Sequence, residues 1–534
     1  MLGLLLVGCL IVFNSLGISK LLFLFQGRGI REYQLVPLVL VGSFFQMFIL
    51  SVLHFFTPIS FFTLTITSIL ASVGWIMGRQ SVLIKVNTGS RWQRVLLLMM
   101  LFYILVTGAQ EPSWIDSYLY HAQVVQWYNL YPVTKGIANL FCAYGLNSYF
   151  HLLVANYTFR FTGFNIPAAV TSFYILTFSY YFIMESGKYK YGALLILLWY
   201  LVAFWGWESS ISPDLVLCGI IVVGILEYQR KDRTFEGEIL LIVSCAIAPL
   251  IKQSGFIYSF LLIPVLINSK YHISRMVFVM IVSVWCSWGI RNLFLSGYLL
   301  YPLPWFDLFD FKHKVPLPFI TQWLEDITFF ARRPLDDSWQ LVIGKNFLEW
   351  MPTWFLLHRK TDQLLMLLTL VGIFIDGFLV WKHNVFLDRM VWLLIVVAIG
   401  FCLWQTPTMR FLYPYLFILL IRNVHHMATM IKLPSLHTLQ LGTVILLISG
   451  MGYVLLTKGM VWEYPKDYKK VEQQIKYQTP EGITVLVEGT DRCGDIAIPC
   501  VYHLQRKDLH SFSDDLKDGF YMHAKPWSND DIKQ

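Results

Sequence analysis

The chain has 534 residues, of which 56% are apolar and only 14% charged, with a formal net charge of +8. Soluble domains run at about 45–50% apolar and about 25% charged. The composition therefore excludes a large soluble enzyme, a disordered protein and a disulfide scaffold. In a membrane protein the basic excess belongs to cytoplasmic loops, so it does not indicate a nucleic-acid partner.

Apolar segments follow one another through the first 457 residues. A transmembrane helix needs roughly 20 mostly apolar residues, and we predict 13 to 14 spans. A weaker segment at 146–162 carries Asn147, His151, Asn156 and Arg160, and we expect it to be an amphipathic helix on the outer leaflet. The predicted spans are 2–19, 35–56, 60–78, 94–109, 166–185, 191–207, 213–228, 238–251, 255–268, 275–290, 363–381, 389–405, 411–422 and 437–457.

Basic residues orient these spans. Every odd-numbered loop is basic, whereas the short even-numbered loops carry one basic residue in total, Arg410. By the positive-inside rule, the N-terminus then lies outside the cytoplasm. The long loops 110–165 and 291–362 and the tail 458–534 fall on the same outer side. Long loops of this kind concentrate function, so we expect the chemistry on the outer face.

The tail 458–534 is predicted to be a small extracytoplasmic α/β appendage to the membrane domain 1–457. Within it, 465–478 suits a helix, and ITVLVEG at 483–489 alternates like a strand. Cys493 and Cys500 lie close together in an oxidising compartment, so a disulfide is predicted; two free thiols are the alternative.

The first outer loop holds the densest set of candidate residues, EPSWIDSYLYH. If 116–130 is helical, Asp116 and Tyr120 share a face, with His121 beside them. A carboxylate near the membrane surface and close to Trp114 should have a raised pKa and could act as a general base. The alternative is that Asp116 only caps the helix that follows it.

Further charged residues on the predicted outer side are also candidates for the site. Glu208 and Asp214 lie in WGWESSISPDLVL, where Asp214 suits a helix start better than a site. Lys252, in PLIKQSGFI, lies between two short apolar segments, and a Lys at membrane depth usually pairs or lines a polar cavity. Arg410 opens a span and suits a phosphate. For Arg291, in RNLFLSGYLLYPLP, snorkelling is as good a reading as function.

These residues together predict an outward-facing site with one base, two or three cations and an aromatic lining. Cations at the interface suit the phosphate of an amphiphile whose tail stays in the bilayer, and aromatic faces suit sugar rings. A lipid-phosphate substrate is the simplest interpretation.

The chain also resembles polytopic glycosyltransferases of the GT-C superfamily. WIDSYLYH, SPDLVL, PLIKQSGF and PTMRFLYPYLF are similar to motifs at the same topological places in bacterial members. IDSYLYHAQVVQWYNLYPVTKGIANL, RNLFLSGYLLYPLP and CGDIAIPC resemble an uncharacterised bacterial membrane-protein family in or beside GT-C. Superfamily members often pair acids in the first loop, whereas four residues separate Glu111 from Asp116 here, so the resemblance does not extend to a metal site built on such a pair.

The resemblance implies a GT-C-like fold and Asp116 as catalytic base. We therefore expect an inverting glycosyltransferase of the bacterial inner membrane, with both termini outside the cytoplasm. Its partners would be a polyprenyl-phosphate sugar donor, a glycan, lipid or protein acceptor, and membrane lipids. The one cofactor to consider is a divalent metal, Mg²⁺ or Mn²⁺. Lys252, Arg410 and Arg291 would hold the lipid phosphate, with Glu111, Trp114, Tyr120, His121, Glu208 and Asp214 in support. The alternatives are a polysaccharide polymerase for O-antigen or capsule, and a lipid-linked glycan transporter or flippase.

Overall fold

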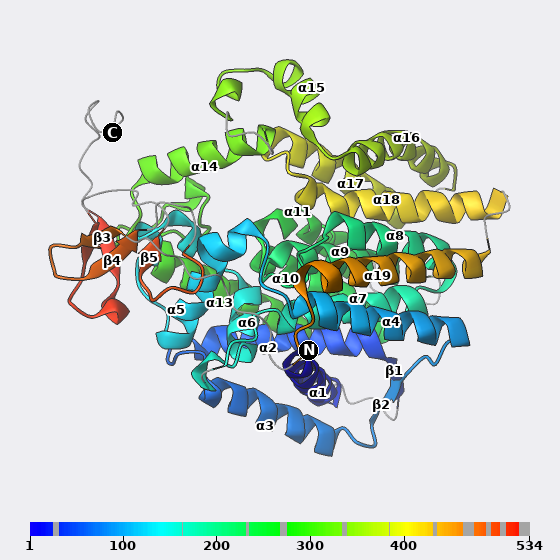
Figure 1. The fold of residues 1–534 in the computed structure, drawn as a ribbon, viewed down its shortest axis with the longest axis horizontal. Helices are drawn as coiled ribbons and strands as arrows, with labels where there is room; N and C mark the ends of the chain where they lie inside the picture. Colours follow the sequence, from blue (N-terminus) through cyan, green and yellow to red (C-terminus); the bar gives the residue numbers. More distant parts are fainter. Residues whose placement is uncertain are drawn as a thin grey trace.

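The computed structural model describes residues 1–24, 31–162, 164–230, 234–267, 275–333, 339–383, 385–430, 435–462, 475–487, 493–501 and 509–522. It is mostly helical, and its longer helices lie side by side in one bundle (Figure 1). The helices are α1 (Leu2–Leu24), α2 (Leu35–Leu53), α3 (Phe61–Met77), α4 (Arg91–Gly108), α5 (Ala122–Leu130), α6 (Tyr149–Tyr157), α7 (Ala169–Tyr180), α8 (Lys190–Ala203), α9 (Pro213–Tyr228), α10 (Phe235–Ile251), α11 (Phe256–Ser259), α12 (Leu262–Ile267), α13 (Arg275–Ser296), α14 (Leu317–Arg332), α15 (Phe347–Leu357), α16 (Lys360–His383), α17 (Phe386–Gln405), α18 (Met409–Met430) and α19 (Leu436–Lys458).

The predicted spans fall in helical segments, because the apolar runs that define the spans also supply buried faces for packing. The span predicted at 255–268 differs, since it is divided into two short helices, α11 and α12. Within the described residues, seven of these helices are long and apolar enough to cross a membrane, as a multi-pass membrane protein requires. They are α1, α2, α4, α13, α16, α17 and α19.

Two strands show that the loops after α1 and α3 lie at the same end of the bundle. β1 (Arg31–Gln34) and β2 (Val82–Lys85) form a parallel pair, with Arg31 opposite Val82. In Figure 1 this pair is at the opposite end of the bundle from the C-terminal strands. Both loops are basic, so two odd-numbered loops share one face, as the charge pattern predicts.

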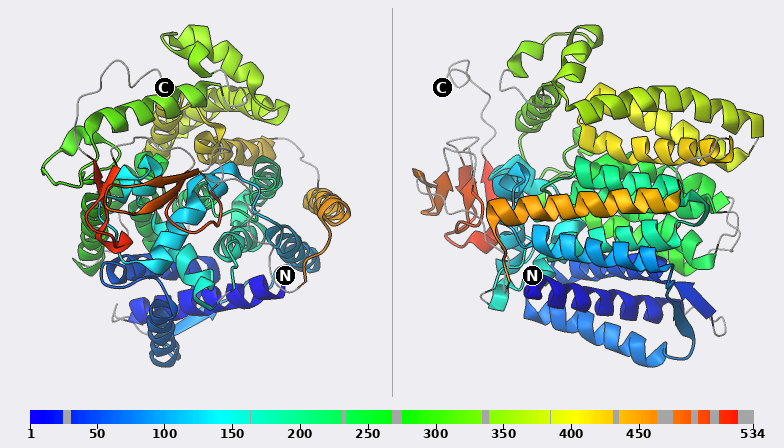
Figure 2. Two further views of the ribbon diagram at one scale, coloured as in Figure 1. Left: turned by 60° about the vertical axis from the view of Figure 1, so that its left-hand side comes forward. Right: turned by 45° about the vertical axis from the view of Figure 1, so that its right-hand side comes forward.

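The start of α1 lies beside the segment that follows α19. The Met1 amino group donates to the Val461 carbonyl at 3.1 Å, and the Leu2 amide donates to the Trp462 carbonyl at 3.0 Å. Both views in Figure 2 place the N-terminus near the end of α19. The two ends of the helical domain therefore share one face of the molecule.

The segment 146–162 differs from its prediction. Its helical part, α6, is buried along its whole length, so it packs inside the protein instead of lying on the outer leaflet. Its polar side chains have protein partners: Asn156 Oδ1 accepts from Thr63 Oγ1 at 2.9 Å, and His151 Nε2 lies 3.2 Å from the Ile211 carbonyl. Polar residues that resembled a solvated face are therefore buried and bound to other parts of the protein.

The C-terminal tail contains short strands. The strands are β3 (Ile475–Gln478), β4 (Thr484–Val487), β5 (Cys500–Val501), β6 (Leu509–Ser511) and β7 (Phe520–Met522). β4 lies within the predicted 483–489 strand, antiparallel to β3 and parallel to β5. The predicted helix 465–478 is wrong at its end, where β3 stands, and its part at 465–474 lies outside the described residues.

Candidate functional site

Four charged side chains from distant parts of the sequence meet at one point. Arg410 Nη1 lies 2.6 Å from Asp116 Oδ2 and 3.5 Å from Asp214 Oδ2. Lys252 Nζ lies 2.6 Å from Asp214 Oδ1. We call Asp116, Asp214, Lys252 and Arg410 the charge quartet. Two carboxylates and two cations give it no net charge.

Each member of the quartet stands at the end of a helix or beside one. Asp116 directly precedes η1 (Ser117–His121), a π-helical turn that leads into α5. Asp214 lies in the first turn of α9. Lys252 directly follows α10, and Arg410 is the second residue of α18. Helix ends gather at the same face because the connected helices alternate in direction, which brings four separate loops together.

Two nearby residues explain why α10 ends just before Lys252. Pro249 lacks an amide hydrogen and stands two residues before the end of α10. Gly255 then allows the chain to return closely, because a Cβ there would lie 2.7 Å from the Ala248 carbonyl oxygen. The chain continues as the short turn η7 (Gln253–Gly255). The backbone thus turns sharply at the lysine.

Aromatic rings surround the quartet. Trp114 Nε1 donates to Asp116 Oδ2 at 3.2 Å, and the Arg410 guanidinium lies 5.7 Å from the centre of the Trp114 ring. Phe411 lies under both cations, at 4.8 Å from Lys252 Nζ and 5.4 Å from the Arg410 guanidinium. Trp207 packs on Trp114 with ring centres 3.7 Å apart. Such faces attract cations and can also stack on sugar rings.

The structure overturns two expectations about Asp116. Its side chain makes no capping hydrogen bond to the helix that follows, so it does not act as a cap. The expected rise in its pKa is also wrong. Burial raises the pKa of Asp116, but Arg410 and Lys252 outweigh it and hold the pKa below the ordinary value of 3.8. Asp116 is therefore held as a carboxylate while it faces Arg410.

The quartet is open on one side. The side chains of Asp116, Lys252 and Arg410 are 15%, 19% and 23% exposed, whereas that of Asp214 is 1% exposed. A ligand entering from the open side would therefore meet two cations and one carboxylate, with the second carboxylate behind them. The sequence favoured Asp214 as a helix start without a role in the site. Asp214 does lie in the first turn of α9, and it also pairs with both cations of the quartet.

Two buried imidazoles lie beside the quartet. The rings of His121 and His151 are 4.6 Å apart, and the ring of Tyr120 is 4.2 Å from that of His121. Burial, His151 and the two nearby cations lower the pKa of His121 well below 6.5, so its imidazole is uncharged. Sequence reasoning missed His151 as a neighbour of the site because it placed α6 at the membrane surface.

Three predicted site residues lie outside the quartet. Glu111 Oε1 accepts from Tyr118 Oη at 2.5 Å. Glu208 is buried and accepts from Tyr103 Oη at 2.6 Å. Arg291 is fully buried. The contacts of Glu111 and Glu208 join loops and helices near the site.

Arg291 does not snorkel to the surface. Its Nε donates to Asn147 Oδ1 at 2.9 Å, and its Nη1 lies 2.9 Å from His54 Nδ1. The guanidinium also lies 5.5 Å from the centre of the Tyr128 ring. These contacts join α13 to the segments after α2 and before α6, which is a packing role.

The quartet suits an anion better than a metal ion. Asp116 and Asp214 are the carboxylates available for a divalent cation, and both already face Arg410 or Lys252. Within the described residues, no group of three His, Cys, Asp or Glu side chains has the arrangement of a metal site. The residues present therefore do not fit the divalent metal that the sequence left open.

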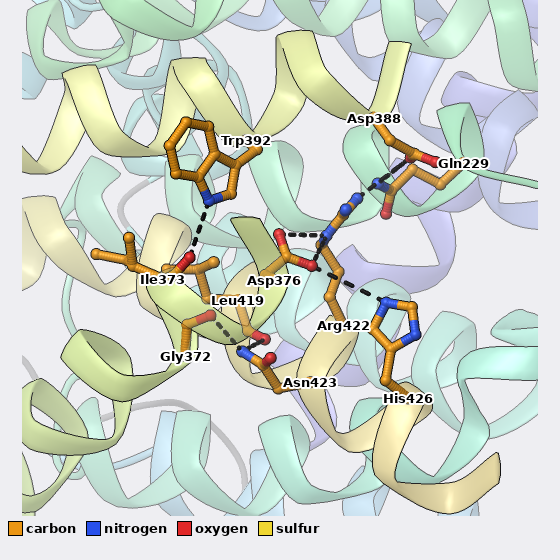
Figure 3. A network of polar contacts seen from close by, with 10 residues as sticks. All are labelled: Gln229, Gly372, Ile373, Asp376, Asp388, Trp392, Leu419, Arg422, Asn423 and His426. Atoms are coloured by element: carbon orange, nitrogen blue, oxygen red, sulfur yellow. Dashed lines mark hydrogen bonds and ion pairs between the residues drawn. The ribbon is translucent and has the colours of Figure 1, made fainter. Parts of the chain in front are cut away.

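A second ion network lies between helices of the bundle, and its Asp376 and Arg422 are buried (Figure 3). Arg422 Nε on α18 lies 2.9 Å from Asp376 Oδ1 on α16. Arg422 Nη1 lies 3.3 Å from Asp388 on α17, and Gln229, just after α9, donates to the same carboxylate at 3.2 Å. This network joins four helices and neutralises Asp376, the clearest charge inside a predicted span.

Comparisons with known proteins identify a family without a known activity. No curated protein and no solved structure matches the chain. A family model described as a domain of unknown function (DUF8201) matches residues 1–417, a range that contains all four members of the charge quartet and stops before the tail. The chain therefore belongs to the DUF8201 family.

Proposed function

We propose that this protein is an inverting glycosyltransferase with a GT-C-like fold of 13 to 14 membrane spans. It would act at the outer face of the bacterial inner membrane, in surface glycan assembly or modification. Its donor would be a sugar linked to polyprenyl phosphate, and its acceptor a hydroxyl of a glycan, lipid or protein. The charge quartet is the observation that carries the proposal, because it joins a carboxylate to two cations on an open, aromatic-lined side.

The quartet supports donor binding by exchange of one anion for another. The donor phosphate would take the place that Asp116 holds on Arg410 and would also face Lys252. Arg410 presents a planar guanidinium that matches phosphate oxygens, and Lys252 adds a second charge. Asp214 is buried behind them and would stay on Lys252. Asp116, on the open side, would be the carboxylate that gives way.

The released carboxylate would then act on the acceptor. Asp116 takes the proton of the acceptor hydroxyl, and the hydroxyl oxygen forms a bond to the anomeric carbon of the sugar. The bond from that carbon to the phosphate oxygen breaks, and its electron pair stays on the lipid phosphate. Negative charge on the phosphate thus increases by one, next to two fixed cations, which is electrostatic stabilisation where charge develops.

A polysaccharide polymerase would use the same residues on a lipid-linked oligosaccharide. The flippase alternative has less support, because transport at membrane depth uses polar or charged groups inside the spans. Asp376, the clearest such group, is 2.9 Å from Arg422 in a buried ion pair, which is a structural arrangement. The candidate catalytic and phosphate-binding charges instead meet at one place, the quartet.

Donor binding and transfer test the proposal directly. The full chain in proteoliposomes should bind polyprenyl phosphate at least tenfold more tightly than polyprenol, which lacks the phosphate. Label from a polyprenyl-phosphate hexose should pass into the glycan, lipid or protein of native membranes that contain the chain, and not into membranes that lack it. Equal binding of the two lipids, or transfer that does not depend on the chain, would reject the proposal.

A further inference from the structure

The tail closes onto the same segment that carries Asp116. Cys493 and Cys500 are joined by a disulfide, and both are fully buried. Within the loop they close, the Gly494 amide donates to the Tyr118 carbonyl at 2.8 Å. Tyr118 belongs to η1, the π-helical turn that begins one residue after Asp116. The tail therefore contacts the backbone of the turn that leads directly to the proposed base.

Gln123 joins the loop to the start of α5. Its side-chain amide donates to the carbonyls of Gly494 at 3.2 Å and Ile496 at 2.8 Å, and its oxygen accepts from the Cys500 amide at 3.3 Å. The Gln123 side chain is fully buried, and the bonds to Gly494 and Cys500 are buried with it. One residue thus binds both ends of the disulfide loop, two positions after the end of η1.

Further contacts fix the loop from its other sides. Asp495 forms an ion pair with Arg160 and accepts from Asn165 Nδ2 at 3.3 Å. The Cys500 carbonyl accepts from Tyr144 Oη. All of these partners belong to the first outer segment of the chain, between the end of α4 and the start of α7. The disulfide loop is therefore packed on that segment at several points.

π-helical turns are rare and frequently lie at functional sites. We infer that the disulfide loop 493–500, bound through Gln123, is a positioning element that holds η1 so that Asp116 faces Arg410. This inference rests on the proposed function for its catalytic consequence. Lys252 directly follows α10 and Arg410 lies on α18, so donor binding should not weaken when the loop is disturbed.

Gln123→Leu tests the role of the bridge, because it keeps a similar side-chain size and removes all three hydrogen bonds. We expect kcat for sugar transfer to fall about 10–100-fold through misplacement of Asp116, whereas KM for the polyprenyl-phosphate hexose should not rise. Cys493→Ser combined with Cys500→Ser should have the same effect. Lys517→Ala, which removes an exposed ion pair elsewhere in the tail, is the matched control and should keep normal kcat.

Hydrogen exchange on the full chain in nanodiscs provides a reading that is independent of activity. In both variants, amides of 117–126 should exchange faster while those of α9 and α10 stay protected. Unchanged exchange in 117–126, unchanged kcat, or a loss of protection throughout the bundle would each overturn the inference. Absence of transfer by the wild-type chain would reject the proposed function alone, and the exchange result would still decide whether the loop holds η1.

Discussion

Replacement of Asp116 by Asn separates its two proposed roles. The amide has nearly the size of the carboxylate, yet it cannot accept the proton of the acceptor hydroxyl. Loss of a general base typically lowers the rate about 10²–10⁴-fold, and we expect this fall in kcat for sugar transfer. Donor binding should not weaken, because Arg410 and Lys252 remain.

Donor binding should in fact become tighter in this variant. In the free protein Asp116 lies 2.6 Å from Arg410 and competes with the phosphate for it. Both side chains are partly exposed, so the pair contributes at most about 1 kcal/mol. Removal of that competition should lower Kd for polyprenyl phosphate by up to about fivefold.

The assay compares transfer of a labelled hexose and binding of polyprenyl phosphate on the same proteoliposomes. Asp307→Asn is the matched control, since Asp307 pairs with Lys314 in an outer loop, outside the quartet. It should change neither quantity. Near-normal turnover by Asp116→Asn would show that Asp116 is not the base, and weaker binding of polyprenyl phosphate would refute the exchange of anions at Arg410.

Three further predictions concern the cations, the pH profile and the topology. Lys252→Ala and Arg410→Ala should each weaken binding of polyprenyl phosphate about 10- to 100-fold, because a hydrogen bond to a charged group contributes about 1.5–3 kcal/mol; equal binding by either variant would remove that residue from the phosphate site. Asp116 must be ionised to act, and its pKa is lowered in the free protein, so the acid midpoint of the pH profile of kcat/KM should lie below pH 3.8. The acid midpoint of kcat should lie higher, because the bound phosphate then occupies Arg410. Coincident midpoints in the two pH profiles would contradict this. Reporter fusions should show cytoplasm at 88, 232 and 385 and the outer side at 130, 330 and 500, and a cytoplasmic signal at 130 or 330 would remove the basis for an outer site.

The sequence predicted much of the helical framework because apolar length is a local property. It also indicated Asp116, Lys252 and Arg410 one by one, since charge at the edge of an apolar span is costly and calls for an explanation. The sequence did not indicate which of these charged residues pair with one another. Asp214 looked like an ordinary helix start because its partner, Lys252, is 38 positions away and faces it only after α9 and α10 pack together.

The errors have a shared cause, which is that burial depends on tertiary packing. The polar residues of α6 resembled a solvated face, yet the surrounding helices supply their hydrogen-bond partners. Arg291 resembled a snorkelling residue, yet His54 and Asn147 hold it inside the protein. The direction of the Asp116 pKa likewise depended on Arg410, which lies 294 positions further along the chain.

The contact between the disulfide loop and Gln123 also sets an order of events during biogenesis. The two partners are 371 positions apart along the chain. At synthesis rates of about 5–20 residues per second, the first outer loop waits roughly 20–70 s before the tail is made. With the proposed topology, the tail would then cross the membrane and be oxidised before it could dock. A newly inserted chain would therefore hold its helices in the bilayer before η1 is fixed, and activity would begin only when the last segment has arrived.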